Sequence, residues 1–94
     1  MRIRTIKHRG LRRFVEVDDA RELNVELVNR IRNIVAAPVV ADSMSDVQGP
    51  PGWRLHMLKG NMAGTWSVSV SGNWRITFRV ENDEITDLNL EDYH

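Results

Sequence analysis

The spacing of apolar residues changes near the middle of this chain, and that change limits the fold more than any other feature. Between residues 8 and 49, apolar residues recur at the three- and four-residue spacing of helices, whereas after residue 52 they alternate with polar residues as in strands. The segment Gly49-Pro50-Pro51-Gly52 separates the two halves and is too short to link separate domains. The pattern therefore predicts a single α+β domain over residues 1–94, with helices packed on one face of a mostly antiparallel twisted sheet.

The N-terminal half is expected to contain a strand and two helices. Residues 2–6 alternate as in a short strand, and apolar residues at helical spacing predict a short helix within residues 8–17. A longer apolar stripe over residues 23–35 predicts a core-facing helix that stops at Pro38. Residues 41–48 are expected to form a loop or a single helical turn.

The C-terminal half contains four alternating runs that predict strands. On one side, the first three carry Trp53, Leu55 and Met57, then Trp66, Val68 and Val70, then Trp74, Ile76, Phe78 and Val80. This spacing assigns the three tryptophans to packing. Ser71-Gly72-Asn73 and Asn82-Asp83 are expected to be hairpin turns. In the last run Ile85 is out of phase with Leu88 and Leu90, which predicts a bulge or a change of facing.

The opposite side of the predicted sheet is polar and carries several cations. It holds Arg54 and His56 from the first run, Thr65, Ser67 and Ser69 from the second, and Arg75, Thr77 and Arg79 from the third. The last strand is expected to add Asp87 and Asp92. Alternation alone is common in sheets covered on one side. Small hydroxyl residues, however, leave room for a ligand, and arginines donate paired hydrogen bonds to phosphate. Arg54, Arg75 and Arg79 are therefore candidate RNA or phosphate contacts.

The charges sum to zero but are separated along the chain. Thirteen basic residues balance thirteen acidic ones, yet residues 1–13 and 47–80 contain basic residues and no acid. If the fold brings these two segments to one side, the local potential would attract a polyanion. An equally weighted alternative is that the charges are scattered over a solvated surface.

Composition excludes several classes of function. The chain has no cysteine, which removes disulfides, a thiolate nucleophile and sulfur-ligated zinc and is compatible with a reducing cytoplasm. No apolar run is long enough to span a membrane, and the N-terminal residues lack a signal peptide's apolar stretch, so a cytoplasmic protein without a membrane partner is expected. His8, His56 and His94 do not have metal-ligand spacing, and no glycine-rich phosphate loop is present, so no metal or cofactor is expected.

The remaining polar residues contain the groups that RNA cleavage needs. Cutting RNA without a metal requires a proton acceptor for the 2′-hydroxyl, a proton donor for the leaving 5′-oxygen, and cations for the phosphoryl oxygens. His56 and His94 are the best proton carriers, Lys59 and Arg75 can hold the charge, and Tyr93 can hydrogen-bond. Each has an ordinary alternative, such as a frayed tail or a solvated lysine at a strand end. Which histidine would be the base is not determined.

Several ordered segments of the chain resemble the HigB-type toxins of the RelE/ParE superfamily, the toxin halves of bacterial type II toxin–antitoxin modules. The segments are Lys7-His8-Arg9-Gly10-Leu11-Arg12-Arg13-Phe14, Pro51-Gly52-Trp53-Arg54-Leu55-His56, Leu58-Lys59-Gly60, residues 64–70, residues 73–78 and Asp92-Tyr93-His94. Two positions depart from the family pattern: Met57 stands where proline is common, and Asn61 stands where aspartate is frequent. Neither departure removes a candidate catalytic group.

The resemblance implies a fold, an activity and partners. It implies a metal-independent endoribonuclease that enters the ribosomal A site, cleaves messenger RNA during translation and so inhibits growth. It also implies a partner antitoxin with a helix-turn-helix domain. The toxin would associate with operator DNA only indirectly, through this antitoxin. By the family pattern the active residues are His56, Lys59, Asp92, Tyr93 and His94, with Arg75 as a phosphate contact.

Two other functions remain as alternatives. Members of the same superfamily inhibit DNA gyrase by binding it, without RNA cleavage, and a degenerate module would bind only RNA or the antitoxin. The retained histidines, lysine and tyrosine argue for the nuclease. Salt-dependent binding to intact RNA would instead indicate the degenerate module.

Overall fold

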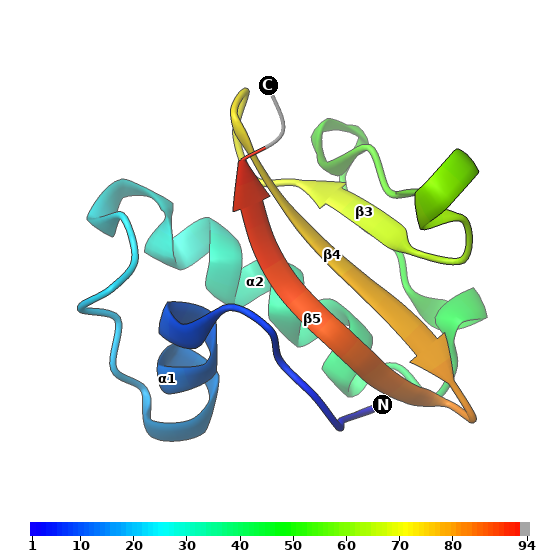
Figure 1. Ribbon diagram of the computed structural model, residues 1–94, viewed down its shortest axis with the longest axis horizontal. Helices are drawn as coiled ribbons and strands as arrows, with labels where there is room; N and C mark the ends of the chain where they lie inside the picture. The colour runs from blue at the N-terminus through cyan, green and yellow to red at the C-terminus, as the bar shows by residue number, and fades with distance from the viewer. Residues whose placement is uncertain (93–94) are drawn as a thin grey trace.

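The computed structural model describes residues 1–92, in which two helices pack against a five-stranded sheet (Figure 1). The helices are α1 (Arg9–Val17) and α2 (Val28–Val40). The strands are β1 (Arg2–Ile3), β2 (His56–Met57), β3 (Trp66–Ser69), β4 (Trp74–Glu81) and β5 (Glu84–Asp92), in the spatial order β1-β5-β4-β3-β2. Only the β1–β5 pair among these strands is parallel. The prediction of an α+β fold with a mostly antiparallel sheet is confirmed.

The hydrophobic core lies between the helices and the sheet, and α2 crosses behind β4 and β5 in Figure 1. Its largest fully buried side chains are Phe78, Leu11, Ile31, Ile34, Ile76, Ile85 and Leu88. The three tryptophans are partly buried and pack against this cluster, as predicted. Among residues 1–92, neither helix has the length and hydropathy that crossing a bilayer requires.

The first helix has a defined cap at each end. The Nδ1 atom of His8 accepts a hydrogen bond of 3.0 Å from the Leu11 N–H, which satisfies one of the free donors of the first turn. At the other end Asp18 adopts the left-handed conformation, with φ of 55°, and its N–H bonds to the Phe14 carbonyl. The prediction of a helix within residues 8–17 is confirmed, and His8 serves as its cap.

The second helix differs from its prediction at both ends. The apolar stripe begins before the helix does, because Val25–Leu27 form a 3₁₀ turn whose start is capped by Asn24. Pro38 was expected to stop the helix, but α2 continues to Val40 with this proline buried inside its last turn. A proline removes one backbone donor, so near a helix end it costs only one intrahelical hydrogen bond.

The expected strand over Trp53, Leu55 and Met57 is also shorter than predicted. Residues Pro51–Trp53 form a 3₁₀ turn, and Arg54 follows it in the left-handed conformation with φ of 49°. Only His56–Met57 pair as a strand, β2. Proline is favoured at the first position of a helical turn, and Pro51 occupies that position here. The apolar–polar alternation of Trp53, Arg54 and Leu55 therefore does not reflect an extended backbone.

The phase break in the last strand is a β-bulge, as predicted. The register between β4 and β5 shifts between Thr77 and Arg79, and Asp87 adopts the left-handed conformation with φ of 53°. The Asp87 N–H donates to the Thr5 hydroxyl at 2.8 Å. The extra residue in β5 allows Ile85 and Leu88 both to reach the core.

The predicted hairpin turns are confirmed. The Val70 N–H donates to the Trp74 carbonyl at 2.9 Å and closes the β3–β4 connection. Asn82 and Asp83 both have positive φ, which suits the two-residue turn between β4 and β5. At the N-terminal end, the predicted strand over residues 2–6 is reduced to β1 and one parallel bridge from Ile6.

A Gly10→Ala variant is expected to be less stable than the wild type. A Cβ at this position would lie 2.8 Å from the Glu22 Cβ and 3.2 Å from the Glu22 carbonyl oxygen. Overpacking typically costs about 1–3 kcal/mol, which outweighs the gain of up to about 1 kcal/mol from alanine's helix propensity. Thermal unfolding would show the loss, with Gly72→Ala as control because no heavy atom lies within 4 Å of its added Cβ. Equal melting temperatures of wild type and Gly10→Ala would contradict the close contact.

Candidate active site on the polar face of the sheet

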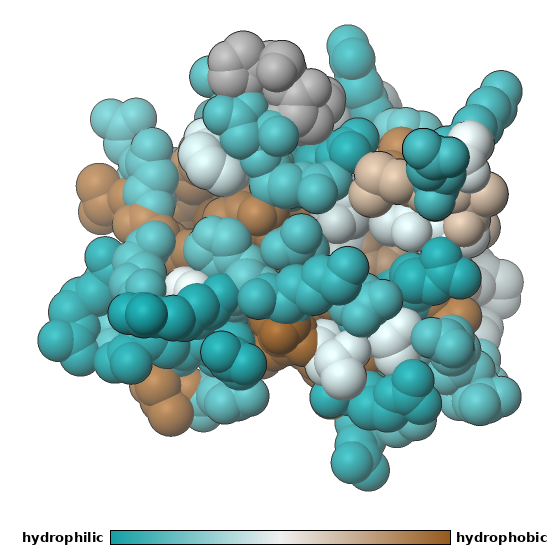
Figure 2. Space-filling model, viewed as in Figure 1, coloured by the Kyte–Doolittle hydropathy of each residue, from teal (hydrophilic) through white to brown (hydrophobic). Residues whose placement is uncertain are grey.

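The strand register places two rows of polar residues on the side of the sheet away from the core. The first row is His56, Ser67, Thr77 and Asn89, and the second is Ser69, Arg75 and Glu91. Residues paired across neighbouring strands direct their side chains to the same side. We call the side that carries both rows the polar face. Figure 2 views the molecule from this side and shows a mostly hydrophilic surface.

The polar face is not an open platform, because part of it is covered by the chain itself. Thr65, Ser67 and Thr77 are buried. The Leu58 N–H donates to the Thr65 carbonyl at 2.8 Å, which closes the segment between β2 and β3 into a loop. Three of the hydroxyl residues expected to leave room for a ligand are therefore buried rather than exposed.

Arg79 is held by that loop. Its Nη1 atom donates to the Ala63 carbonyl at 3.2 Å and to the Thr65 hydroxyl at 3.4 Å. Gly64 lies against the same guanidinium with φ of 90°, a conformation that favours glycine. These contacts give Arg79 a role in fixing the loop, and its predicted contact with RNA stays a prediction.

A groove of about 340 Å³ lies between this loop and β5. It is lined by Lys7, Asn61, Met62, Thr65, Thr77, Arg79, Asp87, Asn89 and Glu91. The lining contains two basic and two acidic side chains, so the groove has mixed charge. Asp87 lies here as predicted.

Arg75 and Glu91 form an ion pair at the centre of the candidate site. The Arg75 Nε and Nη2 atoms donate to the Glu91 Oε1 atom at 2.8 Å and 2.7 Å. The two side chains are only 18% and 27% exposed, so this pair is shielded from solvent more than a typical surface ion pair. Glu91 was not among the predicted site residues. Glu91 precedes Asp92 in an alternating strand, so a shift of facing by one residue would have placed Glu91 on the polar face.

The predicted facing of Asp92 was wrong. Asp92 pairs with Trp74, which packs against the core, whereas Glu91 pairs with Arg75 on the polar face. The bulge at Asp87 explains the difference, because it inserts one residue and so shifts the facing of residues beyond it. The predicted site residues Tyr93 and His94 lie outside the described residues.

His56 is positioned by β2 and by a hydrogen bond to its own segment. Its Nδ1 atom lies 2.5 Å from the Arg54 carbonyl oxygen. A carbonyl oxygen can only accept, so Nδ1 must carry the proton, and in the neutral ring Nε2 is then the acceptor. The side chain is exposed at the edge of the sheet. Nε2 is therefore suited to take a proton from a bound ligand.

Lys59 follows His56 by three residues and is also exposed. It precedes the 3₁₀ turn Gly60–Met62, and Gly60 has φ of 69°, so the chain turns sharply just after the lysine. The structure thus places His56 and Lys59 in one short segment at the β2 edge. Strand β5 lies three strands from β2, or about 14 Å at about 4.8 Å per strand, with Arg75 of β4 between them.

The basic N-terminal segment does not form a continuous positive surface with residues 47–80. Arg2 and Arg4 pair with acids of the β4–β5 hairpin. Arg9 pairs with Glu22, and Arg13 pairs with Glu22 and Asp19. These acids lie outside residues 1–13 and neutralise four of the six basic side chains of the segment locally. Its Lys7 nevertheless lines the groove.

Asp19 is the best-satisfied carboxylate of that region. Its side chain is 15% exposed and accepts hydrogen bonds from Arg21 and Arg13, which lower the pKa of Asp19 well below its usual value. A lowered pKa means that the ionised carboxylate stabilises the fold fully above pH about 4, and that this contribution is lost as pH falls toward the folded-state pKa.

We therefore expect Asp19→Asn to be less stable than the wild type at neutral pH, with a difference that shrinks as the pH is lowered below about 4. Urea unfolding at a series of pH values would measure it. Asp42→Asn is the matched control, because Asp42 is exposed and forms no ion pair with residues 1–92. A difference that stays constant down to the lowest pH would contradict the assignment.

Comparison with known proteins identifies the family. The family described as the RelE-like toxin of the type II toxin–antitoxin system HigB matches residues 4–94. The protein named endoribonuclease HigB from Proteus vulgaris is 36% identical over 92 residues, covering 98% of this chain and 99% of the relative.

Solved structures share the fold at low sequence identity. A chain of the YoeB–YefM complex from Staphylococcus aureus superposes with a TM-score of 0.64 at 17% identity, covering 100% of this chain and 99% of that chain. YafQ from Escherichia coli BL21(DE3) gives a TM-score of 0.55 at 9% identity, covering 97% of this chain and 93% of that chain. Because the family match extends over nearly the whole sequence, this chain belongs to the HigB-like family of RelE-like toxins.

Proposed function

We propose that this protein is the toxin of a type II toxin–antitoxin module and acts as an endoribonuclease that cleaves messenger RNA in the ribosomal A site, which stops translation. Family membership and the Proteus vulgaris relative named endoribonuclease HigB support the activity. The geometric observation that carries it is the exposed His56, whose Nδ1–H is bound by the Arg54 carbonyl, three residues from Lys59.

The reaction follows from the tautomer of His56. Its Nε2 takes the proton of the ribose 2′-hydroxyl while the 2′-oxygen attacks the adjacent phosphorus. The bond from phosphorus to the 5′-oxygen breaks, and the leaving oxygen receives a proton from His94. The products are a 2′,3′-cyclic phosphate and a 5′-hydroxyl end. Each proton transfer is worth roughly 10²–10⁴-fold in rate.

The cations stabilise the negative charge that develops on the phosphoryl oxygens. Lys59 supplies an ammonium beside His56. Arg75 supplies a guanidinium, and a phosphoryl oxygen there would share or displace the carboxylate of Glu91, which binds two of its nitrogens. We assign Tyr93 to orienting the scissile nucleotide and Asp92 to setting the imidazole or phenol. Arg54 and Arg79 are assigned to the RNA backbone.

The partners follow from the same function. Two structural relatives are chains of complexes, the YoeB–YefM complex from Staphylococcus aureus and the DinJ–YafQ toxin–antitoxin complex from Escherichia coli. By analogy we propose a helix-turn-helix antitoxin as partner, with operator DNA met only through it. The ribosome and messenger RNA are the targets, which places the activity in the cytoplasm.

Mapping transcript 5′ ends after brief induction tests this function. We expect new ends within translated regions, at positions defined by codons, and their loss when the start codon of a reporter message is removed. Intact transcripts under arrested growth would overturn the proposal. If DNA supercoiling changed instead, the protein would act on gyrase, and salt-dependent RNA binding without cuts would indicate a binding module.

A further inference from the structure

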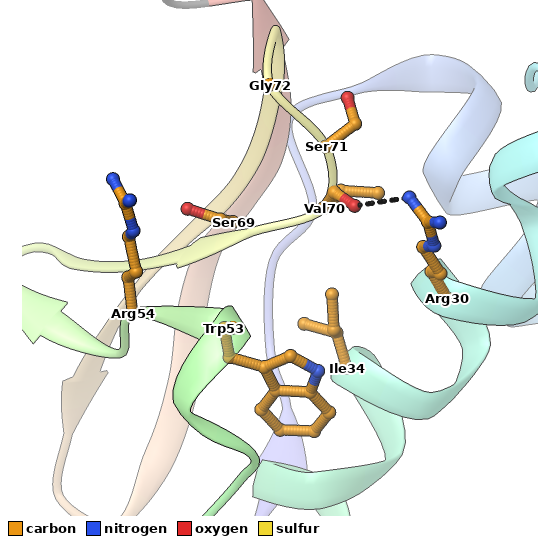
Figure 3. A pocket seen from close by; sticks show the side chains of 9 residues that line it. Arg30, Ile34, Trp53, Arg54, Ser69, Val70, Ser71 and Gly72 are labelled. Atoms are coloured by element: carbon orange, nitrogen blue, oxygen red, sulfur yellow. Dashed lines mark hydrogen bonds between the residues drawn. The ribbon is translucent and has the colours of Figure 1, made fainter.

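A second hollow of about 540 Å³ lies next to the candidate active site, between α2, the 3₁₀ turn Pro51–Trp53 and the β3–β4 turn. In Figure 3 the guanidinium groups of Arg30 and Arg54 lie on opposite sides of it, and the hydroxyl residues Ser69 and Ser71 lie between them. Among residues 1–92, none of the nine that line it is acidic. The hollow therefore presents two positive charges and hydroxyl donors, and no carboxylate of residues 1–92 lines it.

Arg54 has a left-handed backbone conformation, which is unfavourable for a residue with a Cβ. Its φ of 49° lies in the left-handed region, where glycine is preferred over residues with a Cβ. Its N–H bonds to the Pro51 carbonyl at 3.1 Å, which ends the 3₁₀ turn and would serve any residue equally well. Its exposed guanidinium has no bonding partner among residues 1–92. Strain at an exposed charged residue is typical of functional positions.

Arg30 is anchored on the other wall. Its Nη1 atom donates to the Val70 carbonyl at 3.2 Å, drawn as the dashed line in Figure 3. This bond uses one of the five N–H donors of the guanidinium and fixes the group beside the hollow. Ile34 and the Trp53 ring form an apolar wall below. Arg30 is thus fixed, whereas the Arg54 guanidinium has no bonding partner within the described residues 1–92, and the two arginines come from different elements.

Two residues that line the hollow contact residues of the candidate active site. Ser69 lines the hollow and pairs in register with Arg75, the central cation of the polar face. The Arg54 carbonyl accepts the Nδ1–H of His56, so the two residues are held together. An RNA strand bound at His56 and Arg75 would therefore lie beside two residues of the hollow, Arg54 and Ser69.

We propose that this hollow binds an RNA phosphate at least one nucleotide away from the bond that is cleaved. The inference rests on the proposed nuclease function and adds a second phosphate subsite, formed by Arg30, Arg54, Ser69 and Ser71. Two guanidinium groups offer charge-assisted hydrogen bonds to phosphoryl oxygens, and contacts of this kind position a nucleic acid without reading its sequence. The phosphate can come from the message or from ribosomal RNA.

The test uses messages on programmed ribosomes with one neutral methylphosphonate linkage placed at each position in turn. Single-turnover cleavage gives the toxin concentration for half-maximal rate. For the wild type, we expect one neutral linkage away from the cut to raise this concentration roughly tenfold, as for the loss of a charge-assisted hydrogen bond. For the Arg54→Gly and Arg30→Gln variants, we expect a higher half-maximal toxin concentration than for the wild type on a message with only phosphate linkages. A neutral linkage at the sensitive position should then cause no further increase in these variants.

Controls separate binding from folding. Arg54→Gly is expected to melt at the same temperature as the wild type or higher, because glycine relieves the left-handed strain. Arg32→Gln removes a charge from the same helix, where Arg32 bonds to Asp18 on a surface outside the hollow, and is expected to keep the wild-type cleavage pattern.

The outcomes distinguish the two phosphate sources and the two proposals. If a neutral linkage at one message position raises the half-maximal concentration of the wild type but not of the variants, the phosphate belongs to the message. If neutral linkages affect the variants and the wild type equally, while both variants bind message-free ribosomes more weakly, the phosphate belongs to ribosomal RNA. Unchanged half-maximal concentrations in both variants, with an active wild type, overturn the subsite and leave the nuclease intact. A wild type that cuts no message overturns the nuclease, and the subsite with it.

Discussion

A His56→Asn variant is expected to fold normally and to cleave RNA about 10²–10⁴-fold more slowly than the wild type. The asparagine amide can replace the Nδ1–H bond to the Arg54 carbonyl, because both are short planar donors. It has no atom in the place of Nε2, so it cannot accept the 2′-hydroxyl proton. Single-turnover cleavage on programmed ribosomes measures the rate, and thermal unfolding checks the fold. Wild-type cleavage by well-folded His56→Asn would show that another group is the base.

The companion change is His94→Ala, which is expected to abolish growth inhibition in cells while the fold stays intact. If His56 and His94 act as base and acid in one step, the double variant will lose little more activity than either single variant, because groups that act as a unit are not additive. Equal toxicity from well-expressed His94→Ala protein would reject the role of the C-terminal imidazole.

Phe78→Ala is expected to remove a large part of the stability of this protein. Phe78 is 1% exposed at the centre of β4, pairs with Trp66 and lies where the β4–β5 register shifts at the bulge. Truncating a buried phenylalanine typically costs about 3–5 kcal/mol, because apolar contacts are lost and a cavity remains. Domains of this size are stable by only about 5–15 kcal/mol.

Urea unfolding would measure this loss as a lower midpoint. Val40→Ala is the control, because Val40 is 81% exposed at the end of α2 and its truncation should change the stability by no more than about 0.5 kcal/mol. A loss below about 1 kcal/mol for Phe78→Ala would mean that the core closes over the cavity, and that the bulge region is more adaptable than its burial indicates.

The sequence predicted the layers of this protein because the relevant information is local. Strand side chains alternate between two faces, so the facing of His56, Ser67 and Arg75 follows from their spacing. The Asn82-Asp83 turn follows from residues that tolerate positive φ. Even the bulge in β5 was visible, as a break in phase between Ile85 and Leu88. Local rules failed at Pro38 and Trp53, where packing and turn geometry overrode the pattern.

The sequence by itself determined the two-layer fold, the family and which side of the sheet is polar. Only the tertiary structure decided how the charges on that side are paired. Glu91 binds Arg75, a backbone carbonyl sets the tautomer of His56, and Arg30 and Arg54 meet across one hollow. The reason is range: periodicity acts between residues a few positions apart, whereas an ion pair or a pocket depends on atoms from distant segments that meet only after folding.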